Sequence, residues 1–293
     1  MKITKTKKLI VSAACLGMAS LLLVYASWAW FSSTRAVKAA GITLHVKTPD
    51  NIQISLTGGA ADAEWTEALD VDTDAVLAAQ IDNFDASRPV FVLPASTYAG
   101  FDHTLYATSR AKTDGQAYED TTFYAGRPIG FSAQSGSYEG HYLDVPLYFR
   151  TWDESGASLH LSKTADGPPA TRIISTDGSA IHTIARVAFL NGDKTQNAVG
   201  ETIPLVYAEE DRQTASVVTG ESHSFAVPDY LTFSGGLSDR RVVELAGPVE
   251  ENGVTKLDVQ KIVLRIWIEG QDNRCTMNMG KKTFTVHLAF AAK

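Results

Sequence analysis

Cysteine is nearly absent from this sequence. Only Cys15 and Cys275 occur among 293 residues, and Cys15 lies inside the first long apolar stretch. If that stretch is removed, one cysteine remains, which excludes an intrachain disulfide and a zinc site built on cysteines. Lipidation of Cys15 is disfavoured because Ser12 stands where a lipobox has a large aliphatic residue. The fold is therefore expected to be held together by its apolar core.

The motifs of several enzyme classes are also missing. No two of the seven histidines are four residues apart, so there is no His-Glu-x-x-His zinc signature. The sequence has no Gly-x-Ser-x-Gly elbow, no Walker loop and no dinucleotide fingerprint. We therefore expect a protein that is not an enzyme and binds no cofactor.

The most prominent feature present is the apolar stretch from Leu9 to Phe31. It contains no charged residue, and four lysines precede it. At about 1.5 Å per helical residue it is long enough to cross a membrane, but small residues at Ser27 and Ala29 also fit a signal peptide cleaved between Ala29 and Trp30. Under both interpretations residues 32–293 lie outside the cytoplasm, and only residues 9–31 contact a membrane. The predicted location is extracellular, secreted or on the cell surface.

The charge of the chain without this leader is strongly acidic. The leader holds four of the 26 Lys and Arg residues and none of the 33 Asp and Glu residues, which leaves a formal charge near −11. Such a charge argues against nucleic acid and against anionic lipid as partners.

Short alternating apolar runs dominate the remainder and predict an all-β fold. The alternation is clearest at residues 42–46, 52–56, 143–149, 262–268 and 284–290. Residues 42–56 are expected to form a hairpin, and Pro146 predicts an edge or a bulge in its strand. One short helix is expected within residues 72–84, with Asp72 at its N-terminus. Because no β-α-β rhythm appears, we predict an antiparallel, jelly-roll-like β-sandwich preceded by an N-terminal apolar signal or anchor helix.

The same reasoning divides the chain into three parts. Residues 1–29 are the signal peptide or a retained anchor, residues 30–40 are an extension, and residues 41–293 are a single β-sandwich domain. No internal repeat, low-complexity linker or shift in composition marks a second folded domain.

Three segments resemble the TasA/camelysin family of exported Gram-positive surface and biofilm matrix proteins. The first is the junction Ser27-Trp28-Ala29-Trp30-Phe31-Ser32-Ser33, which is similar to the region cut by the dedicated signal peptidase SipW. The second is residues 142–150, and the third is residues 265–275, which hold the pattern Trp-x-Glu-Gly-x-Asp-x-x-Cys. The family-like residues of the third segment are Trp267, Glu269, Gly270, Asp272 and Cys275.

The resemblance implies a jelly roll whose partners are a SipW-type signal peptidase and copies of itself or related matrix subunits. In TasA, an N-terminal strand of one subunit completes a sheet of the next. The corresponding donor strand would be residues 30–40, with an extension toward Val46. Residues 34–40 are small and basic and do not favour a β-strand, so a monomeric surface protein remains open.

Two groups of acidic residues are candidate sites. Asp70, Asp72 and Asp74 begin like a calcium loop, but Ala75 and Ile81 stand where an EF-hand has Gly and Glu, so a solvated turn with a helix cap is the alternative. Glu269 and Asp272 could act as the paired carboxylates of a glycosidase, although an ion pair between Glu269 and Arg265 is the simpler interpretation.

The function predicted from the sequence is therefore that of an exported structural protein of the cell surface or matrix, which forms fibres by N-terminal strand donation. The alternative is a monomeric surface module that binds a glycan or a host protein through its Tyr- and Gly-rich loops, residues 98–124 and 132–142.

Overall fold

The structure is a computed structural model. It divides the chain into two units, residues 1–36 and residues 37–293. Of the first unit only Met18 is described, so the account below concerns the second. Among the described residues, no helix has the length and apolarity that a membrane crossing requires. The predicted leader helix lies outside them, apart from Met18. The residues that the structure describes are 18, 39–40, 42–59, 61–97, 105–107, 124–162, 170–202, 205–209, 229–231, 240–270, 272, 274–275 and 281–292.

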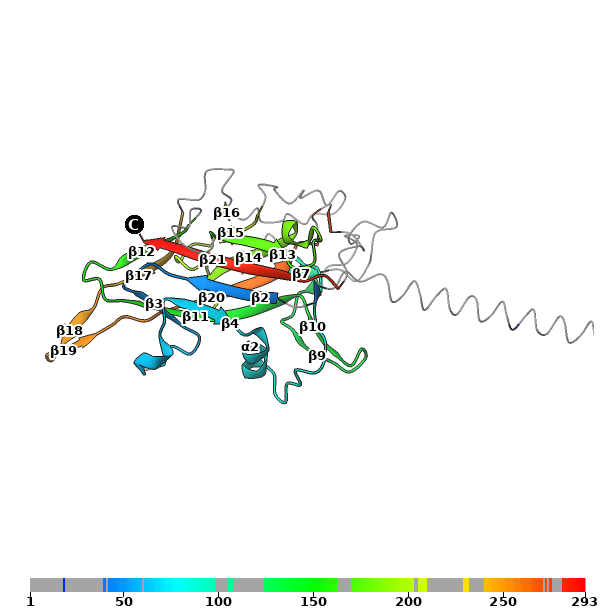
Figure 1. Ribbon diagram of the computed structural model, residues 1–293, viewed down its shortest axis with the longest axis horizontal. Coiled ribbons are helices and arrows are strands. Elements are labelled where there is room, and N and C mark those ends of the chain that lie inside the picture. Colours follow the sequence, from blue (N-terminus) through cyan, green and yellow to red (C-terminus); the bar gives the residue numbers. More distant parts are fainter. Residues whose placement is uncertain are drawn as a thin grey trace, which may run out of the picture. The chain divides into compact units, whose positions relative to one another are not determined.

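Strands make up most of the described part, as Figure 1 shows, so the prediction of an all-β fold is confirmed. The two longest sheets have the orders β16-β15-β14-β20-β11-β3 and β17-β12-β21-β2-β4, with β13 also paired to β21. Three smaller sheets have the orders β1-β5-β10-β9, β6-β7-β8 and β18-β19. The strands are β1 Ala39–Ala40, β2 Ile42–Lys47, β3 Ile52–Ser55, β4 Ala68–Val71, β5 Val90–Val92, β6 Ser96–Thr97, β7 Leu105–Ala107, β8 Tyr124–Ala125, β9 Gly130–Ser132, β10 Ser137–Gly140, β11 Tyr142–Thr151, β12 Ala157–Leu161, β13 Arg172–Ser175, β14 Ala185–Asn191, β15 Leu205–Tyr207, β16 Asp229–Leu231, β17 Arg241–Leu245, β18 Val249–Glu251, β19 Val254–Lys256, β20 Gln260–Ile268 and β21 Phe284–Ala292.

The two longest sheets face each other across a common apolar core, which gives a sandwich. Phe149 on β11 and Phe189 on β14 both make edge contacts with Phe290 on β21, with ring centroids 5.5 and 6.5 Å apart. The alternating residues of β11 and β20 that were expected to point inward are all buried. Burial of such aromatic and aliphatic side chains supplies most of the stabilisation, since disulfides are excluded by composition.

The hairpin predicted for residues 42–56 is wrong. β2 pairs with β21 and β4, whereas β3 pairs with β11 in the opposite sheet. The turn between them therefore carries the chain from one layer to the other. The Thr48 hydroxyl donates to the carbonyl of Ile52 at 2.6 Å and lies 3.1 Å from that of Glu67, which fixes this crossing. A polar turn between two alternating runs does not specify whether the runs pair with each other or lie in opposite sheets.

The sheets are mixed and not antiparallel throughout, which corrects the predicted architecture. β2 runs parallel to β21, β10 runs parallel to β5, and β15 runs parallel to β16. The first of these pairs places an N-terminal strand beside the C-terminal one, in the interior of a sheet. Parallel neighbours need a long connection between them, and strand periodicity contains no information on such distant partners.

Pro146 lies where its strand lacks a neighbour on one side. β11 pairs with β20 along most of its length, but β3 covers only residues 148–151. In the uncovered half, the amide of Gln80 donates to the carbonyl of Asp144 at 2.7 Å, and the Ile129 N–H donates to the carbonyl of Tyr142 at 3.1 Å. The predicted edge position of this proline is confirmed locally, since a proline there removes no ladder hydrogen bond on the uncovered side.

The predicted helix is present as α2, Thr73–Gln80, and is shorter than its apolar pattern suggested. Its N-cap is Asp72, whose carboxylate accepts a hydrogen bond from the Asp74 N–H at 3.0 Å. Two single turns of 3-10 helix, η1 Asp62–Glu64 and η2 Ile181–Thr183, precede β4 and β14. The β18–β19 hairpin extends away from the sandwich in Figure 1, and all of its residues are exposed.

Candidate functional site

The family-like segment, residues 265–275, covers the last residues of β20 and the residues that follow it. Ala95 and Glu269 form an isolated parallel bridge, in which the Ala95 N–H donates to Ile268 and the Gly270 N–H donates to Ala95, both at 2.9 Å. An added Cβ at Gly270 would lie 3.0 Å from the Cβ of Pro94, which is closer than ordinary contact. Glycine at this position therefore lets the two backbones approach.

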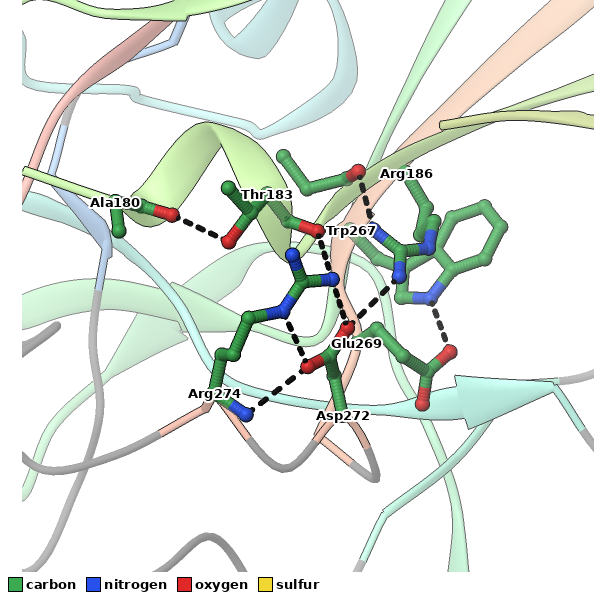
Figure 2. A network of polar contacts seen from close by, with 8 residues as sticks. Ala180, Thr183, Arg186, Trp267, Glu269, Asp272 and Arg274 are labelled. Atoms are coloured by element: carbon green, nitrogen blue, oxygen red, sulfur yellow. Dashed lines mark hydrogen bonds and ion pairs between the residues drawn. The ribbon is translucent and has the colours of Figure 1, made fainter. Parts of the chain in front are cut away.

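A buried carboxylate at the centre of this segment binds two arginines, as Figure 2 shows. One Oδ of Asp272 is 3.1 Å from Arg186 and 2.7 Å from Arg274, and the other accepts from the side-chain Nε and the backbone N–H of Arg274, both at 2.9 Å. The carbonyl of Thr183 also accepts from both arginines, at 2.8 and 3.0 Å. The network ties η2, β14 and the turn after β20 together.

The other family-like side chains are enclosed as well. Trp267, Glu269 and Cys275 are fully buried, and the indole N–H of Trp267 donates to Glu269 at 3.4 Å. Burial raises the pKa of the Cys275 thiol well above its usual range, and the carboxylates of Glu269 and Asp272 add to this. A buried thiol of raised pKa is a poor nucleophile and forms no intermolecular bridge while its surroundings stay folded.

The charges of this cluster favour ionised Asp272. Burial by itself raises the pKa of the Asp272 carboxyl, but hydrogen bonds from Arg274 and the charges of Arg186 and Arg274 outweigh it, so the pKa is lowered overall. With Glu269 fully buried and Asp272 only 4% exposed, a sugar cannot reach either carboxylate in this conformation. The geometry therefore suits a structural network that holds the turn, not a pair of glycosidase acids.

Arg265 has a different partner from the one expected. Its guanidinium makes two hydrogen bonds to Asp144 on β11, at 2.8 and 2.9 Å, and lies 4.1 Å from the centroid of the Tyr142 ring. Lys194 approaches the same carboxylate at 3.3 Å. The predicted cross-strand ion pair of Arg265 exists, but its acid is Asp144 and not Glu269, because Asp144 lies directly opposite on the paired strand.

The three aspartates of the calcium candidate have separate surroundings. Asp70 on β4 contacts the imidazole of His45 on β2, whereas Asp72 caps α2 and Asp74 lies in the first turn of that helix. Within the described residues, no group of three or more His, Cys, Asp or Glu side chains is arranged to hold a metal ion. The alternative of a turn with a helix cap describes Asp72, and calcium binding stays a prediction without a supporting contact.

No family model matches this sequence, and no curated protein matches it either. The cleavage pair Ala29 and Trp30 lies outside the described residues, as do most of residues 98–124. The family resemblance of the junction and of residues 265–275 therefore stays a prediction.

The sequence analysis missed Arg186, Arg274 and Asp144. A signal for Arg186 was present, since it is the one charged residue in the apolar run Ala185–Leu190, all of which is buried. A buried arginine requires an acidic partner. Its partner Asp272 is 86 residues away, and only the tertiary fold could identify it.

A buried histidine beside this region gives a pH prediction. His141 is 2% exposed, and its Nδ1 accepts a hydrogen bond from the Arg127 N–H at 3.0 Å. Burial, and then the charge of Arg127, lower the pKa of His141 from 6.5 to about 4. In the unfolded chain the His141 imidazole takes up a proton near pH 6.5, whereas in the folded chain it stays neutral down to about pH 4. The free energy of unfolding therefore falls as the pH is lowered from 6.5 toward 4.

For His141→Asn we expect a smaller loss of stability on acidification, because the Asn oxygen can accept the same hydrogen bond and does not titrate. The free energy of unfolding of the wild-type protein should drop by about 2–3 kcal/mol more than that of the variant between pH 7 and pH 4.5. Urea unfolding at both pH values measures this difference. Equal losses in the two proteins would contradict the prediction, since all other histidines are retained.

Proposed function

We propose that this chain is an exported structural protein of the cell surface or extracellular matrix, similar to TasA, that assembles through its N-terminal extension and is not an enzyme. In this proposal a SipW-type peptidase cleaves between Ala29 and Trp30, and the sandwich is a jelly-roll variant. The observation that carries the proposal is the position of β1. Ala39 and Ala40 pair with Val92 and Phe91 of β5, at one edge of a four-stranded sheet.

This position supports strand exchange for a physical reason. An edge strand offers a row of backbone groups, and any extended segment of suitable direction can pair with it. In the described part of the extension, two residues pair with that edge, so exchange of this pairing with the extension of another copy costs few contacts. An extension freed at residue 30 would add further pairs along the same edge.

The test is assembly of the full chain, expressed with its own leader, against a variant that lacks residues 30–40. Electron microscopy and size-exclusion chromatography over a range of concentrations should show fibres or oligomers for the processed protein and monomers for the deletion. The matched control lacks residues 249–256, the exposed β18–β19 hairpin, and should assemble. Assembly of the 30–40 deletion, or loss of assembly in the hairpin deletion alone, would contradict strand donation.

The alternative is a binding module. Of the loops expected to bind, residues 98–104 and 108–123 lie outside the described residues, and residues 132–142 contain β10. The observation that favours binding lies elsewhere, at an exposed indole after β11.

A further inference from the structure

The end of β11 presents an aromatic surface that the structural role does not use. Trp152 follows directly after the strand and is 52% exposed, which is unusual for so large an apolar side chain. The guanidinium carbon of Arg150 lies 6.0 Å from the centroid of the Trp152 ring and 4.4 Å from that of Trp65, which is buried. The indole of Trp65 is thus covered, whereas the indole of Trp152 is open to solvent and lies near the Arg150 guanidinium.

The residues beneath Trp152 are held in fixed positions. The Nε of Arg150 donates to the Gln53 side-chain oxygen at 2.9 Å, and another guanidinium nitrogen donates to Asp62 at 2.8 Å. Gln53 lies opposite Arg150 in the β3–β11 ladder, and the Trp65 indole N–H donates to the carbonyl of Gly59 at 2.9 Å. Such a preorganised surface loses little entropy when a ligand binds.

Two polar atoms of this surface are left for a ligand. The amide nitrogen of Gln53 and the second carboxylate oxygen of Asp62 have no hydrogen-bond partner in the part of the chain that the structure describes. The Asp62 side chain is 85% exposed. The donor and the acceptor belong to side chains that bind the same Arg150 guanidinium, whose carbon lies 6.0 Å from the Trp152 ring centroid, and the charge of Asp62 is balanced by Arg150.

We propose that Trp152, Gln53 and Asp62 form a binding platform for a pyranose ring of a neutral polysaccharide. The C–H face of a sugar ring packs on an indole, and adjacent hydroxyl groups can donate to Asp62 and accept from Gln53. A polyanionic glycan is disfavoured by the acidic chain. A proline-rich peptide is a poorer fit, because such peptides dock in grooves lined by several exposed aromatic rings, whereas Trp65 is covered here.

The platform rests on the proposed export only because export brings the protein to polysaccharides, and its chemistry does not depend on assembly. Binding is measured with the purified full chain, expressed with its own leader, against amorphous cellulose, chitin and a soluble β-1,3-glucan. Depletion from solution serves for the insoluble polymers, and affinity electrophoresis serves for the glucan. The variants are Trp152→Ala and Trp152→Phe, which change an exposed side chain and are expected to fold, and Asp62→Ala, whose fold is checked by circular dichroism because it removes the acid that pairs with buried Arg150.

The matched control is Phe131→Ala. Phe131 is 49% exposed and also lies near an arginine, with the Arg88 guanidinium carbon 5.1 Å from its ring centroid, but both oxygens of the aspartate that pairs with Arg88, Asp85, already accept hydrogen bonds, from Ser87 and from Arg88. We expect wild type and Phe131→Ala to bind one of the three polymers equally. Trp152→Ala should bind about tenfold more weakly or worse, Asp62→Ala should be weakened, and Trp152→Phe should retain part of the binding.

Three results would overturn the platform. The first is that the wild-type protein binds none of the three polymers. The second is that Trp152→Ala and Phe131→Ala bind equally well. The third is that the protein binds a polyproline peptide through Trp152 and does not bind polysaccharide. The variant that lacks residues 30–40 separates this proposal from the proposed function. If that variant binds the polysaccharide, the platform stands whether or not the protein forms fibres.

Discussion

Replacing Asp272 by alanine is expected to lower the free energy of unfolding by about 3–5 kcal/mol. Arg186 is fully buried, and its guanidinium lies 3.1 Å from the Asp272 carboxylate. Removal of that carboxylate takes a close counter-charge from a buried arginine, and it also removes three hydrogen bonds from Arg274. Urea unfolding followed by circular dichroism measures the change. A total stability of about 5–15 kcal/mol is typical, so a loss of this size is severe.

The control for this prediction is an acid–base pair of the same charges that is exposed to water. Glu251 and Lys256 pair across the β18–β19 hairpin, with side chains 57% and 63% exposed. Glu251→Ala should change the free energy of unfolding by less than about 1 kcal/mol, because exposed pairs are solvated and screened. The double variant Arg186→Met with Asp272→Leu should recover part of the loss, since both charges of the pair are removed together. A loss below about 1 kcal/mol for Asp272→Ala would show that the carboxylate does not neutralise Arg186.

Truncation of the chain before β2 and after β2 should give opposite results. A protein that begins at residue 41 is expected to fold, because β1 contributes only two residues to a small sheet. A protein that begins at residue 48 is expected to stay unfolded. β2 lies between β21 and β4 and pairs with both, so its loss opens the sheet in its interior.

The size of the second effect follows from the side chains removed. Ile42, Leu44 and Val46 are 7%, 0% and 2% exposed, and each contributes about 1.5–3 kcal/mol of burial before the empty space left behind is counted. Their sum, together with two lost ladders, is comparable to the whole stability of a domain. Circular dichroism and the dispersion of the amide proton spectrum distinguish the two outcomes. A cooperative thermal transition in the shorter protein would contradict the position of β2.

These truncations also define the donor strand. The sequence resemblance extended the donor toward Val46, but residues 42–47 belong to the sandwich of their own chain. In the proposed assembly, a donated segment that leaves the donor subunit folded is therefore confined to residues 30–40. The boundary between the proposed donor segment, residues 30–40, and the core strand β2 falls at residue 41.

The sequence predicted the elements whose signal is local. The alternation in β2, β11, β20 and β21 predicted strands, and the turn chemistry at Asp72 predicted the start of α2, because backbone periodicity and capping depend only on near neighbours. Composition and charge also led to the prediction, without reference to any fold, that disulfides and nucleic-acid partners are absent.

The partners of those elements were decided by the tertiary structure. That residues 42–47 lie parallel to the C-terminal strand, that Arg265 pairs with Asp144, and that Asp272 binds Arg186 and Arg274 all depend on segments far apart in the chain. The same holds for the position of Arg150 between the exposed indole of Trp152 and the buried indole of Trp65, at 6.0 and 4.4 Å from their ring centroids. The local sequence pattern determines which face of a strand is apolar. The neighbour of each strand is determined by packing and charge neutralisation across the whole core, and these interactions exist only in the folded chain.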